Sequence, residues 1–398
     1  MISYTKYNLV NDLGFVKTGV DDYPGIKKYF STGSIKKNTF IPEGIYDYKS
    51  RPSRANREVS EGDVLQARMQ DTNKIVLVDK ELHGDLFSTG FFQFRPPKEL
   101  IVPKYLYYFL SSDLFLKRKD ELCGGSTQKA INDKNLSKID IFLPPLKEQQ
   151  RIVTKLDAAF SEIDEAIEVV NERYNNTNSL IATAQNALFE DMPLSIPRLK
   201  LSEAAKFENG DRGKNYPSKK YQLSEGIPFV NAGDFSLDGD ITRDGMAYIS
   251  EERFDLLGAG KFQKDDVLFC LRGSLGKSAI NKTLKRGAIA SSLVIIRALQ
   301  DVYPDYLFAF IRSDIVKKYI SETAGGTAQP NLSAKVVMGY EIPVPSLQEQ
   351  EAIADKFWAL RLQGLKAISL IKKKKSELMA LKIAILTQEL QSPESEVA

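Results

Sequence analysis

The hydrophobic positions along the chain follow two different periods, and each half of the chain shows both. Residues 1–142 and 191–343 contain short apolar runs separated by glycine, proline, asparagine and aspartate, a pattern that indicates strands joined by turns. Residues 143–190 and 344–392 begin with prolines and then place apolar residues at every third or fourth position, which is typical of long helices. The sequence therefore predicts an α+β protein of two sheet-based lobes, each followed by one long helix, with a tail at residues 393–398.

The apolar stripes of the two predicted helices suit a coiled coil. A helix of about 40 residues extends about 60 Å, which is longer than a small domain needs internally. We therefore expect the helices to pair antiparallel and to act as a spacer, with the lobes at opposite ends around an approximate two-fold axis. Gly364 weakens the second stripe. The stripe positions are Ile152, Leu156, Phe160, Ile163, Ile167, Val170, Tyr174, Thr177, Ile181, Ala184 and Leu188, and then Ile353, Phe357, Leu360, Ile368, Ile371, Leu378, Leu381 and Ile385.

A second set of apolar residues on these helices lies off the stripe. Apolar residues on a second helix face indicate that further helices pack there. This set comprises Val153, Val169, Leu180, Leu365 and Leu370. The lysine run at 372–375 favours a solvated helix face over a nucleic-acid patch.

The two halves of the chain repeat one unit. Gly-Gly-Ser-Thr-Gln at 124–128 aligns with Gly-Gly-Thr-Ala-Gln at 325–329, and Leu-Lys-Glu-Gln at 146–149 aligns with Leu-Gln-Glu-Gln at 347–350, both at an offset of 201 positions. Gly-Asp-Val-Leu at 62–65 resembles Asp-Asp-Val-Leu at 265–268 at an offset of 203. Self-similarity on this scale predicts that two copies of one lobe-and-helix unit fill the chain.

Composition limits the chemistry that the chain can support. Its 398 residues include 55 basic and 52 acidic ones, and the net charge of +3 identifies no partner by itself. Two cysteines and one histidine, His83, argue against a zinc cage, a disulfide framework and histidine-based catalysis. No apolar stretch approaches about 18 residues and the first 18 residues lack a signal core, so we expect a soluble cytoplasmic protein.

Lobe one carries basic and amide side chains on both sides of a predicted strand at 64–67. Lys and Arg neutralise phosphates, whereas Arg, Gln and Asn present planar groups that pair with base edges. Because Pro52, Ser53 and Asn56 are poor helix formers, we expect residues 51–57 to form an exposed DNA-binding loop, with a generic solvated loop as the alternative. The candidates are Arg51, Arg54, Arg57, Arg68, Gln70 and Lys74, with Gln128 and Lys129 from the glycine-rich segment.

Lobe two carries a polar loop at 209–217 and a basic, glycine-containing segment at 271–278, after a predicted strand at 266–270. The second segment differs from a phosphate-binding loop, because Leu271 stands where that motif needs glycine and residues 279–287 predict a hairpin rather than a helix. We expect both segments to contact DNA, with plain turns as the alternative. The candidates are Arg212, Lys214, Asn215, Tyr216, Arg272, Ser274 and Lys277, with Gln329 from the second glycine-rich segment. Both glycine-rich segments could instead dock each lobe on its helix.

The combination of these motifs resembles the specificity subunit of type I restriction-modification systems. The resemblance covers essentially the whole chain and rests on the repeated lobe, on Leu-Pro-Pro-Leu-Lys-Glu-Gln-Gln-Arg-Ile at 143–152, on Ile-Pro-Val-Pro-Ser-Leu-Gln-Glu-Gln-Glu-Ala-Ile at 342–353, and on the Gly-Asp-Val-Leu and Gly-Gly-x-x-Gln elements. It implies two target recognition domains that each read one half of a bipartite DNA sequence. It also implies that the helices set the gap between the halves and bind two methylation subunits.

By the same resemblance, the chain is a subunit without a catalytic centre, a cofactor or a metal. S-adenosylmethionine, ATP and Mg²⁺ are expected only on its partners, the two methylation subunits and restriction subunits, and double-stranded DNA is its ligand; no membrane is expected. Two other functions stay open: a two-lobed adaptor that binds proteins through its helices, and an NTPase that uses Gly-Lys-Ser at 276–278. DNA affinity that falls steeply with salt would separate a DNA-binding protein from an adaptor.

Overall fold

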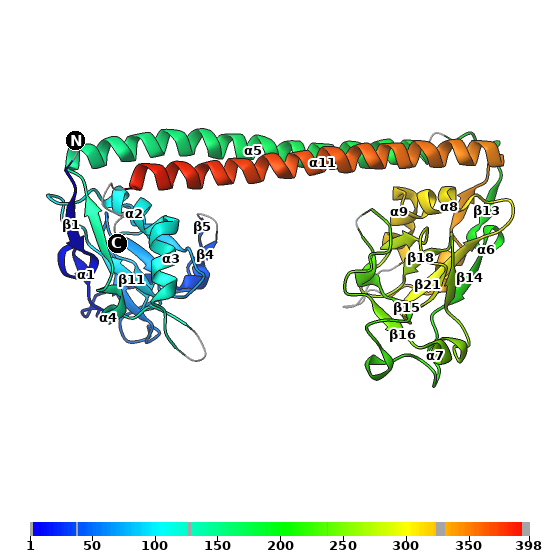
Figure 1. Cartoon of the computed structure of the whole chain (residues 1–398), viewed down its shortest axis with the longest axis horizontal. Coiled ribbons are helices and arrows are strands. Elements are labelled where there is room, and N and C mark those ends of the chain that lie inside the picture. The colour runs from blue at the N-terminus through cyan, green and yellow to red at the C-terminus, as the bar shows by residue number, and fades with distance from the viewer. Residues whose placement is uncertain are drawn as a thin grey trace. The chain divides into compact units, whose positions relative to one another are not determined.

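The computed structural model describes residues 3–36, 39–125, 129–190, 192–236, 238–323 and 331–391. It consists of two compact units, of which the first contains residues 1–170 and 374–398 and the second contains residues 171–373. Each unit combines one lobe with part of both long helices, α5 (Leu146–Glu190) and α11 (Leu347–Leu390) (Figure 1). Among the described residues, none of the helices is both long enough and apolar enough for a bilayer crossing.

Lobe one contains two four-stranded sheets. In the order of the strands, the first sheet is β6 (Gly44–Tyr46), β3 (Lys27–Phe30), β10 (Leu86–Ser88) and β7 (Ala55–Glu58). The second sheet is β2 (Phe15–Val16), β11 (Phe91–Phe94), β8 (Val64–Ala67) and β9 (Ile75–Leu77). Two short antiparallel pairs complete the lobe: β1 (Thr5–Asn8) with β12 (Asp140–Leu143), and β4 (Ile35–Lys36) with β5 (Thr39–Phe40).

Lobe two repeats both four-stranded sheets and the terminal strand pair in the same order, while an isolated bridge between Phe235 and Ile241 stands where lobe one has β4 and β5. Its first sheet is β16 (Ala247–Ile249), β15 (Ile227–Val230), β20 (Arg286–Ile289) and β17 (Lys261–Gln263). Its second sheet is β14 (Ala205–Asn209), β21 (Leu293–Ala298), β18 (Val267–Cys270) and β19 (Ser278–Ile280), and β13 (Arg198–Lys200) pairs with β22 (Glu341–Pro343). In both lobes the two central strands of the first sheet are parallel, β3 with β10 and β15 with β20. The predicted duplication of the lobe is confirmed.

Short helices surround the sheets of both lobes. Lobe one has α1 (Leu9–Asp12), α2 (Pro103–Ser111), α3 (Asp113–Glu121), α4 (Asp133–Leu136) and the 3₁₀ turn η1 (Thr32–Ser34). Lobe two has α6 (Leu201–Ala204), α7 (Glu251–Asp255), α8 (Pro304–Ile311), α9 (Asp314–Thr323), α10 (Ala334–Met338), and the 3₁₀ turns η2 (Lys219–Tyr221) and η3 (Ala232–Asp234). Both α2 and α8 begin with proline, which has no N–H to leave unpaired in a first helical turn.

The main core of each unit lies where the second sheet meets the long helices. In the first unit, α2 packs between them, and Leu106 joins Phe92 of β11 to Leu156 of α5 and Leu386 of α11 (Figure 1). In the second unit, Phe308 and Phe310 of α8 pack in the same way with Val294, Phe189 and Phe357. Burying such side chains stabilises each by about 1.5–3 kcal/mol, so every lobe is fixed to its stretch of paired helix.

Within each unit, α5 and α11 run antiparallel, as the stripes predict. In the first unit, Lys155 Nζ lies 2.6 Å from Glu389 Oε1 and Lys382 Nζ lies 2.7 Å from Asp164 Oδ2. In the second unit, Ile181 of α5 packs against Gly364 of α11, and Lys372 lies over the Tyr174 ring at 5.9 Å. In both units, residue numbers rise along one helix as they fall along the other.

Three helix positions differ from the predicted stripes. Val153 lies off the stripe but is only 3% exposed, because the first turns of α5 also pack against the core of lobe one. Leu381 lies on the predicted stripe but is 48% exposed, and Leu365 is half-buried rather than exposed. The other off-stripe residues are exposed, at 47% for Val169, 70% for Leu180 and 68% for Leu370.

The predicted hairpin at 279–287 is wrong. Residues 278–280 form β19 in one sheet, whereas residues 286–289 form β20 in the other sheet. Asn281 explains the change of sheet: its buried Nδ2 donates to Gln263 O and Leu284 O, both at 2.8 Å, and its Oδ1 accepts from Leu284 N at 2.9 Å. The true hairpin joins β18 to β19, so the basic segment at 271–277 forms its tip.

Candidate nucleic-acid interface

In each lobe, the tip of one β-hairpin pairs with residues that come shortly after the repeated glycine-rich segment in the sequence. In lobe one, Ile131 N donates to Arg68 O at 2.9 Å and Met69 forms a β-bridge with Ala130. In lobe two, Leu332 N donates to Leu271 O at 3.0 Å and Arg272 forms the matching bridge with Asn331. Equivalent residues of the two lobes therefore pair with equivalent hairpins, whereas the whole second glycine-rich segment, 325–329, lies outside the described residues. Gln128 and Gln329 lie outside the described residues.

A cleft of about 570 Å³ in lobe one brings Arg54 and Arg68 together. Arg54 is exposed. The Arg68 guanidinium is held by Phe91 O at 3.1 Å, by Ile131 O at 3.2 Å and by Asp133 Oδ1 at 2.7 Å. Arg68 is therefore a fixed part of the cleft wall, and Arg54 is an exposed donor that also lines the cleft. Other side chains that line the cleft are Tyr29, Glu43, Ser53, Ser88 and Thr89.

A cleft of about 620 Å³ in lobe two brings Arg212 and Arg272 together, with Lys335 and Asn209 beside them. Both arginines are exposed, and Arg212 Nη2 donates to Ser291 O at 3.2 Å. Asp211 holds the loop in place because its Oδ2 accepts from Gly258 N at 2.8 Å. Three basic side chains at one opening favour an anionic ligand such as a nucleic-acid phosphate.

Lys74 and Lys277 occupy equivalent places in the two hairpins. Lys74 Nζ donates to Thr32 O at 2.6 Å, and Lys277 Nζ donates to Ala232 O at 2.7 Å. Each lysine therefore ties its hairpin to the 3₁₀ turn, η1 or η3, that follows the parallel strand of the other sheet. Their contact with DNA stays a prediction.

The predicted exposed loop at 51–57 ends three residues early, at Arg54. Strand β7 begins at Ala55 and points the Arg57 side chain inward, where it is 1% exposed. Its guanidinium donates to Val16 O at 3.0 Å and to Thr18 Oγ1 at 2.8 Å. Burial lowers the pKa of Arg57 to about 10, so it stays protonated at neutral pH. The expectation of a solvent-exposed side chain is therefore wrong for Arg57. Arg51, at the start of the loop, stacks its guanidinium over the Tyr48 ring, with Cζ 4.4 Å from the ring centroid.

The remaining candidates are divided between tips and packed positions. Lys129, Lys214 and Ser274 are exposed. Gln70 is half-buried, and its backbone N donates to Lys129 O at 3.0 Å. Asn215 Nδ2 donates to Leu256 O at 2.8 Å. Tyr216 packs edge-on against Phe229, with ring centroids 5.9 Å apart.

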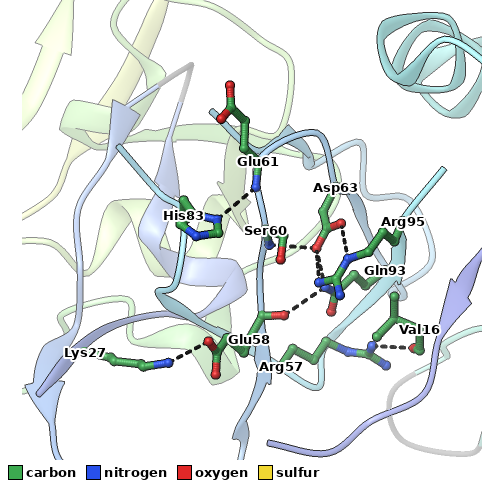
Figure 2. A network of polar contacts seen from close by, with 10 residues as sticks. All are labelled: Val16, Lys27, Arg57, Glu58, Ser60, Glu61, Asp63, His83, Gln93 and Arg95. Atoms are coloured by element: carbon green, nitrogen blue, oxygen red, sulfur yellow. Dashed lines mark hydrogen bonds and ion pairs between the residues drawn. The ribbon is translucent and has the colours of Figure 1, made fainter. Parts of the chain in front are cut away.

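Sequence reasoning missed an ion pair that both lobes contain, between a buried aspartate and an arginine nearer the surface. Figure 2 shows Asp63 accepting from Arg95 Nε and Nη2 at 2.9 Å, from Gln93 Nε2 at 2.8 Å and from Ser60 N at 2.8 Å. The hydrogen bonding between the Arg95 guanidinium and the Asp63 carboxylate raises the pKa of Arg95. Asp266 and Arg297 form the same pair in lobe two at 2.7 Å. The repeated Asp-Val-Leu element was the available signal.

The repeated glutamine at the start of each long helix is also structural. Gln149 Oε1 accepts from Val102 N at 2.9 Å, and its Nε2 donates to Leu100 O at 3.0 Å and Pro144 O at 2.9 Å. Gln350 repeats the pattern with Tyr303 N at 2.8 Å, Asp301 O at 3.0 Å and Pro345 O at 2.9 Å. Each glutamine thus locks a long helix to the segment before α2 or α8.

The geometry of lobe two excludes the phosphate-loop interpretation of residues 271–278. Ser278 is the first residue of strand β19, whereas a phosphate-binding loop leads into a helix. Lys277 is engaged with Ala232 O. The NTPase alternative is therefore wrong, because residues 276–278 do not form the loop and helix start that phosphate binding needs.

Comparison with known proteins identifies the family. The family model for the type I restriction modification DNA specificity domain matches residues 15–172 and again residues 199–380. The chain belongs to this family. The two matches fall on the two repeats that the sheets define.

Curated relatives extend along most of the chain. The type I restriction enzyme MjaVIII specificity subunit of Methanocaldococcus jannaschii is 24% identical over 375 residues, which cover 84% of this chain and 82% of that protein. The type I restriction enzyme EcoKI specificity subunit of Escherichia coli is 22% identical over 376 residues, which cover 88% and 77%.

Two solved structures share the fold. A chain from a study of complex assembly and conformational transition in a type I restriction-modification system aligns with a TM-score of 0.82 at 22% identity, covering 98% of this chain and 99% of that chain. The HsdS subunit from Thermoanaerobacter tengcongensis aligns with a TM-score of 0.57 at 23% identity, covering 97% and 96%.

Proposed function

We propose that this chain is the DNA specificity subunit of a type I restriction-modification complex, in which each lobe reads one half of a bipartite target. The observation that carries this proposal is the duplicated lobe, which presents a hairpin tip and an arginine-lined cleft at its edge in both copies. Exposed arginines such as Arg54, Arg212 and Arg272 can neutralise phosphates or bond guanine edges in the major groove. Membership of the DNA specificity family supports the same function.

The paired helices have a second role in this proposal. They set the spacing between the half-sites and dock two methylation subunits, which supply S-adenosylmethionine. Restriction subunits supply ATP and Mg²⁺ chemistry, and this chain contributes recognition without catalysis. The exposed apolar residues Val169, Leu180 and Leu370 support a docking role, because large apolar side chains on a solvent face are typical of interaction surfaces.

Exchange of one lobe tests the modular part of the proposal. Residues 195–343 are replaced by the equivalent segment of another specificity subunit, and the methylated sequence is mapped in cells that contain the methylation subunits. We expect only one half of the target to change, because the other lobe keeps its own cleft and hairpin. A change in both halves would contradict modular reading. DNA affinity that does not fall with salt would instead favour an adaptor.

A further inference from the structure

Two buried polar side chains hold the hairpin tip of lobe one from beneath. Lys119 of α3 is 0% exposed, and its Nζ donates to Met69 O at 2.9 Å and to Thr72 O at 2.8 Å. Gln66 of β8 is also 0% exposed, and its Nε2 donates to the same Thr72 O at 3.3 Å. Both carbonyls belong to the tip between β8 and β9, so the shape of the tip depends on these donors.

The burial of Lys119 is costly enough to require an explanation. A buried ammonium is stable only when it is paired and hydrogen-bonded. Lys119 has two carbonyl acceptors, and Asp120 Oδ1 lies 3.2 Å from its Nζ. The tip it holds includes Asp71 in a left-handed conformation at φ 55°, which a free loop would populate rarely. The ammonium therefore holds the carbonyls of Met69 and Thr72, on both sides of Asp71, in fixed positions.

The same tip carries the candidate base-reading side chain Gln70. Thr72 Oγ1 donates to Gln70 O at 3.2 Å, and Gln70 N donates to Lys129 O at 3.0 Å. Gln70 thus lies between the two residues whose carbonyls Lys119 binds. A shift of either carbonyl moves the Gln70 carboxamide, and bidentate pairing with a base edge depends on the orientation of that group.

Lobe two holds its equivalent tip without a buried ammonium, and Cys270 Sγ donates to Arg272 O in that tip at 3.0 Å. The third residue of β18 is Phe269 where β8 has Gln66, and the seventh residue of α9 is Ile320 where α3 has Lys119. Phe269 is fully buried, and Ile320 lies against Gly276 in the tip. The fold of the lobe therefore does not require a lysine at this place. The two positions differ together between the copies, from a polar pair to an apolar pair.

We propose that Lys119, assisted by Gln66, is a positioning residue for sequence reading by lobe one. It acts on the tip at 69–72 and through it on Gln70, and it does not touch DNA itself. The proposal rests on the proposed function, because it assumes that lobe one reads a half-site. It further assigns different supports to the two tips: the buried ammonium of Lys119 in lobe one, and the packing of Ile320 with the Cys270 thiol in lobe two.

The test uses Lys119→Met, which keeps an unbranched side chain one atom shorter and removes the ammonium. The variant is assembled with its methylation subunits, and binding is measured on duplexes that carry the methylated target and every single-base change in it. We expect discrimination to fall by at least about fivefold at one or two base pairs of the first half-site, since one bidentate base contact discriminates by about five- to 150-fold. Discrimination in the second half-site should stay unchanged.

Matched variants separate positioning from folding. Lys117→Met makes the same change at an exposed position of α3 and should leave discrimination in both half-sites unchanged. Gln66→Leu removes the weaker donor to Thr72 O and should relax the same base pairs by a smaller factor, which keeps the proposal testable if Lys119→Met does not fold. Uniform loss across the whole first half-site would indicate a merely structural role, and unchanged discrimination in both variants would also overturn the proposal. A wild-type complex that discriminates no sequence would overturn the proposed function instead.

Discussion

At the residue scale, the basic side chains that the sequence assigns to DNA differ in whether the protein itself already provides their hydrogen-bond acceptors. Arg54 and Arg272 are exposed at the clefts, whereas Arg68, Lys74 and Lys277 are engaged with main-chain carbonyls. A basic side chain that already donates to a main-chain carbonyl holds the surface in shape, whereas an exposed basic side chain can donate to a ligand. Sequence composition does not separate these roles, because both need the same residue types at the same ends of strands.

The repeated glutamine gives a stability prediction at this scale. We expect Gln350→Glu to lower the free energy of unfolding by about 2–4 kcal/mol, because a carboxylate cannot donate to Asp301 O and Pro345 O and would itself be buried. Trp358 is the single tryptophan and lies in the second unit, so its fluorescence in urea reports that unit. Gln348→Glu, on the exposed side of the same turn, is the control and should leave the transition unchanged. Equal midpoints for both variants would contradict the locking role.

At the element scale, the sequence predicted what local pattern determines. The strand at 64–67 is β8, and both long helices begin after proline pairs, at Leu146 and Leu347. It failed where tertiary contacts decide. The helical period places Val153 on a solvent-facing side of α5, but the core of lobe one buries it. The hydrogen bonds of the Asn281 side chain turn the chain from β19 in one sheet to β20 in the other. The predicted exposure of Arg57 is wrong for the same reason. Side chains alternate between the two faces of a strand, and tertiary contacts decide where β7 begins and which face is buried.

Gly364 looks like a weak point in the second helix, but the structure gives it a packing role. A Cβ at Gly364 would overlap the Ile181 side chain of α5 in the second unit. Gly→Ala in a helix interior gains about 1 kcal/mol in propensity, whereas overpacking costs about 1–3 kcal/mol. We therefore expect Gly364→Ala to be net destabilising by up to about 2 kcal/mol in thermal unfolding. Adding Ile181→Val, which trims the facing side chain, should recover part of the loss, and a more stable single variant would contradict the close approach.

At the scale of the whole molecule, duplication explains why the chain divides across its helices. The main core of each compact unit contains residues of one lobe and of both α5 and α11, so each long helix is divided between the two units. The two lobes keep one strand order while their details differ, as the pairs Gln66 with Lys119 and Phe269 with Ile320 illustrate. A conserved frame with variable tips is what independent reading of two half-sites requires.

The proposed spacer role gives a prediction for the whole molecule. Four residues are inserted in α5 between Thr177 and Ile181 and four in α11 between Gly364 and Ile368, so that the Tyr174–Lys372 and Ile181–Gly364 contacts on either side both keep their register. Each helix gains about 6 Å and roughly preserves its facing, because 3.6 residues complete a turn. With about 3.4 Å per base pair, the gap between methylated adenines should grow by one to two base pairs while both half-sequences remain.

Two control insertions make this prediction sharper. Four residues in α5 alone would break the register with α11 and should destabilise the paired helices, which circular dichroism during thermal unfolding can detect. Two residues in both helices would rotate one end by about 200° relative to the other and should largely abolish binding to the bipartite target. The deciding measurement is the methylated gap in the paired four-residue variant. An active complex with an unchanged gap would mean that the helices do not set the spacing, because a longer rigid pair of helices cannot hold both lobes on half-sites at the original separation.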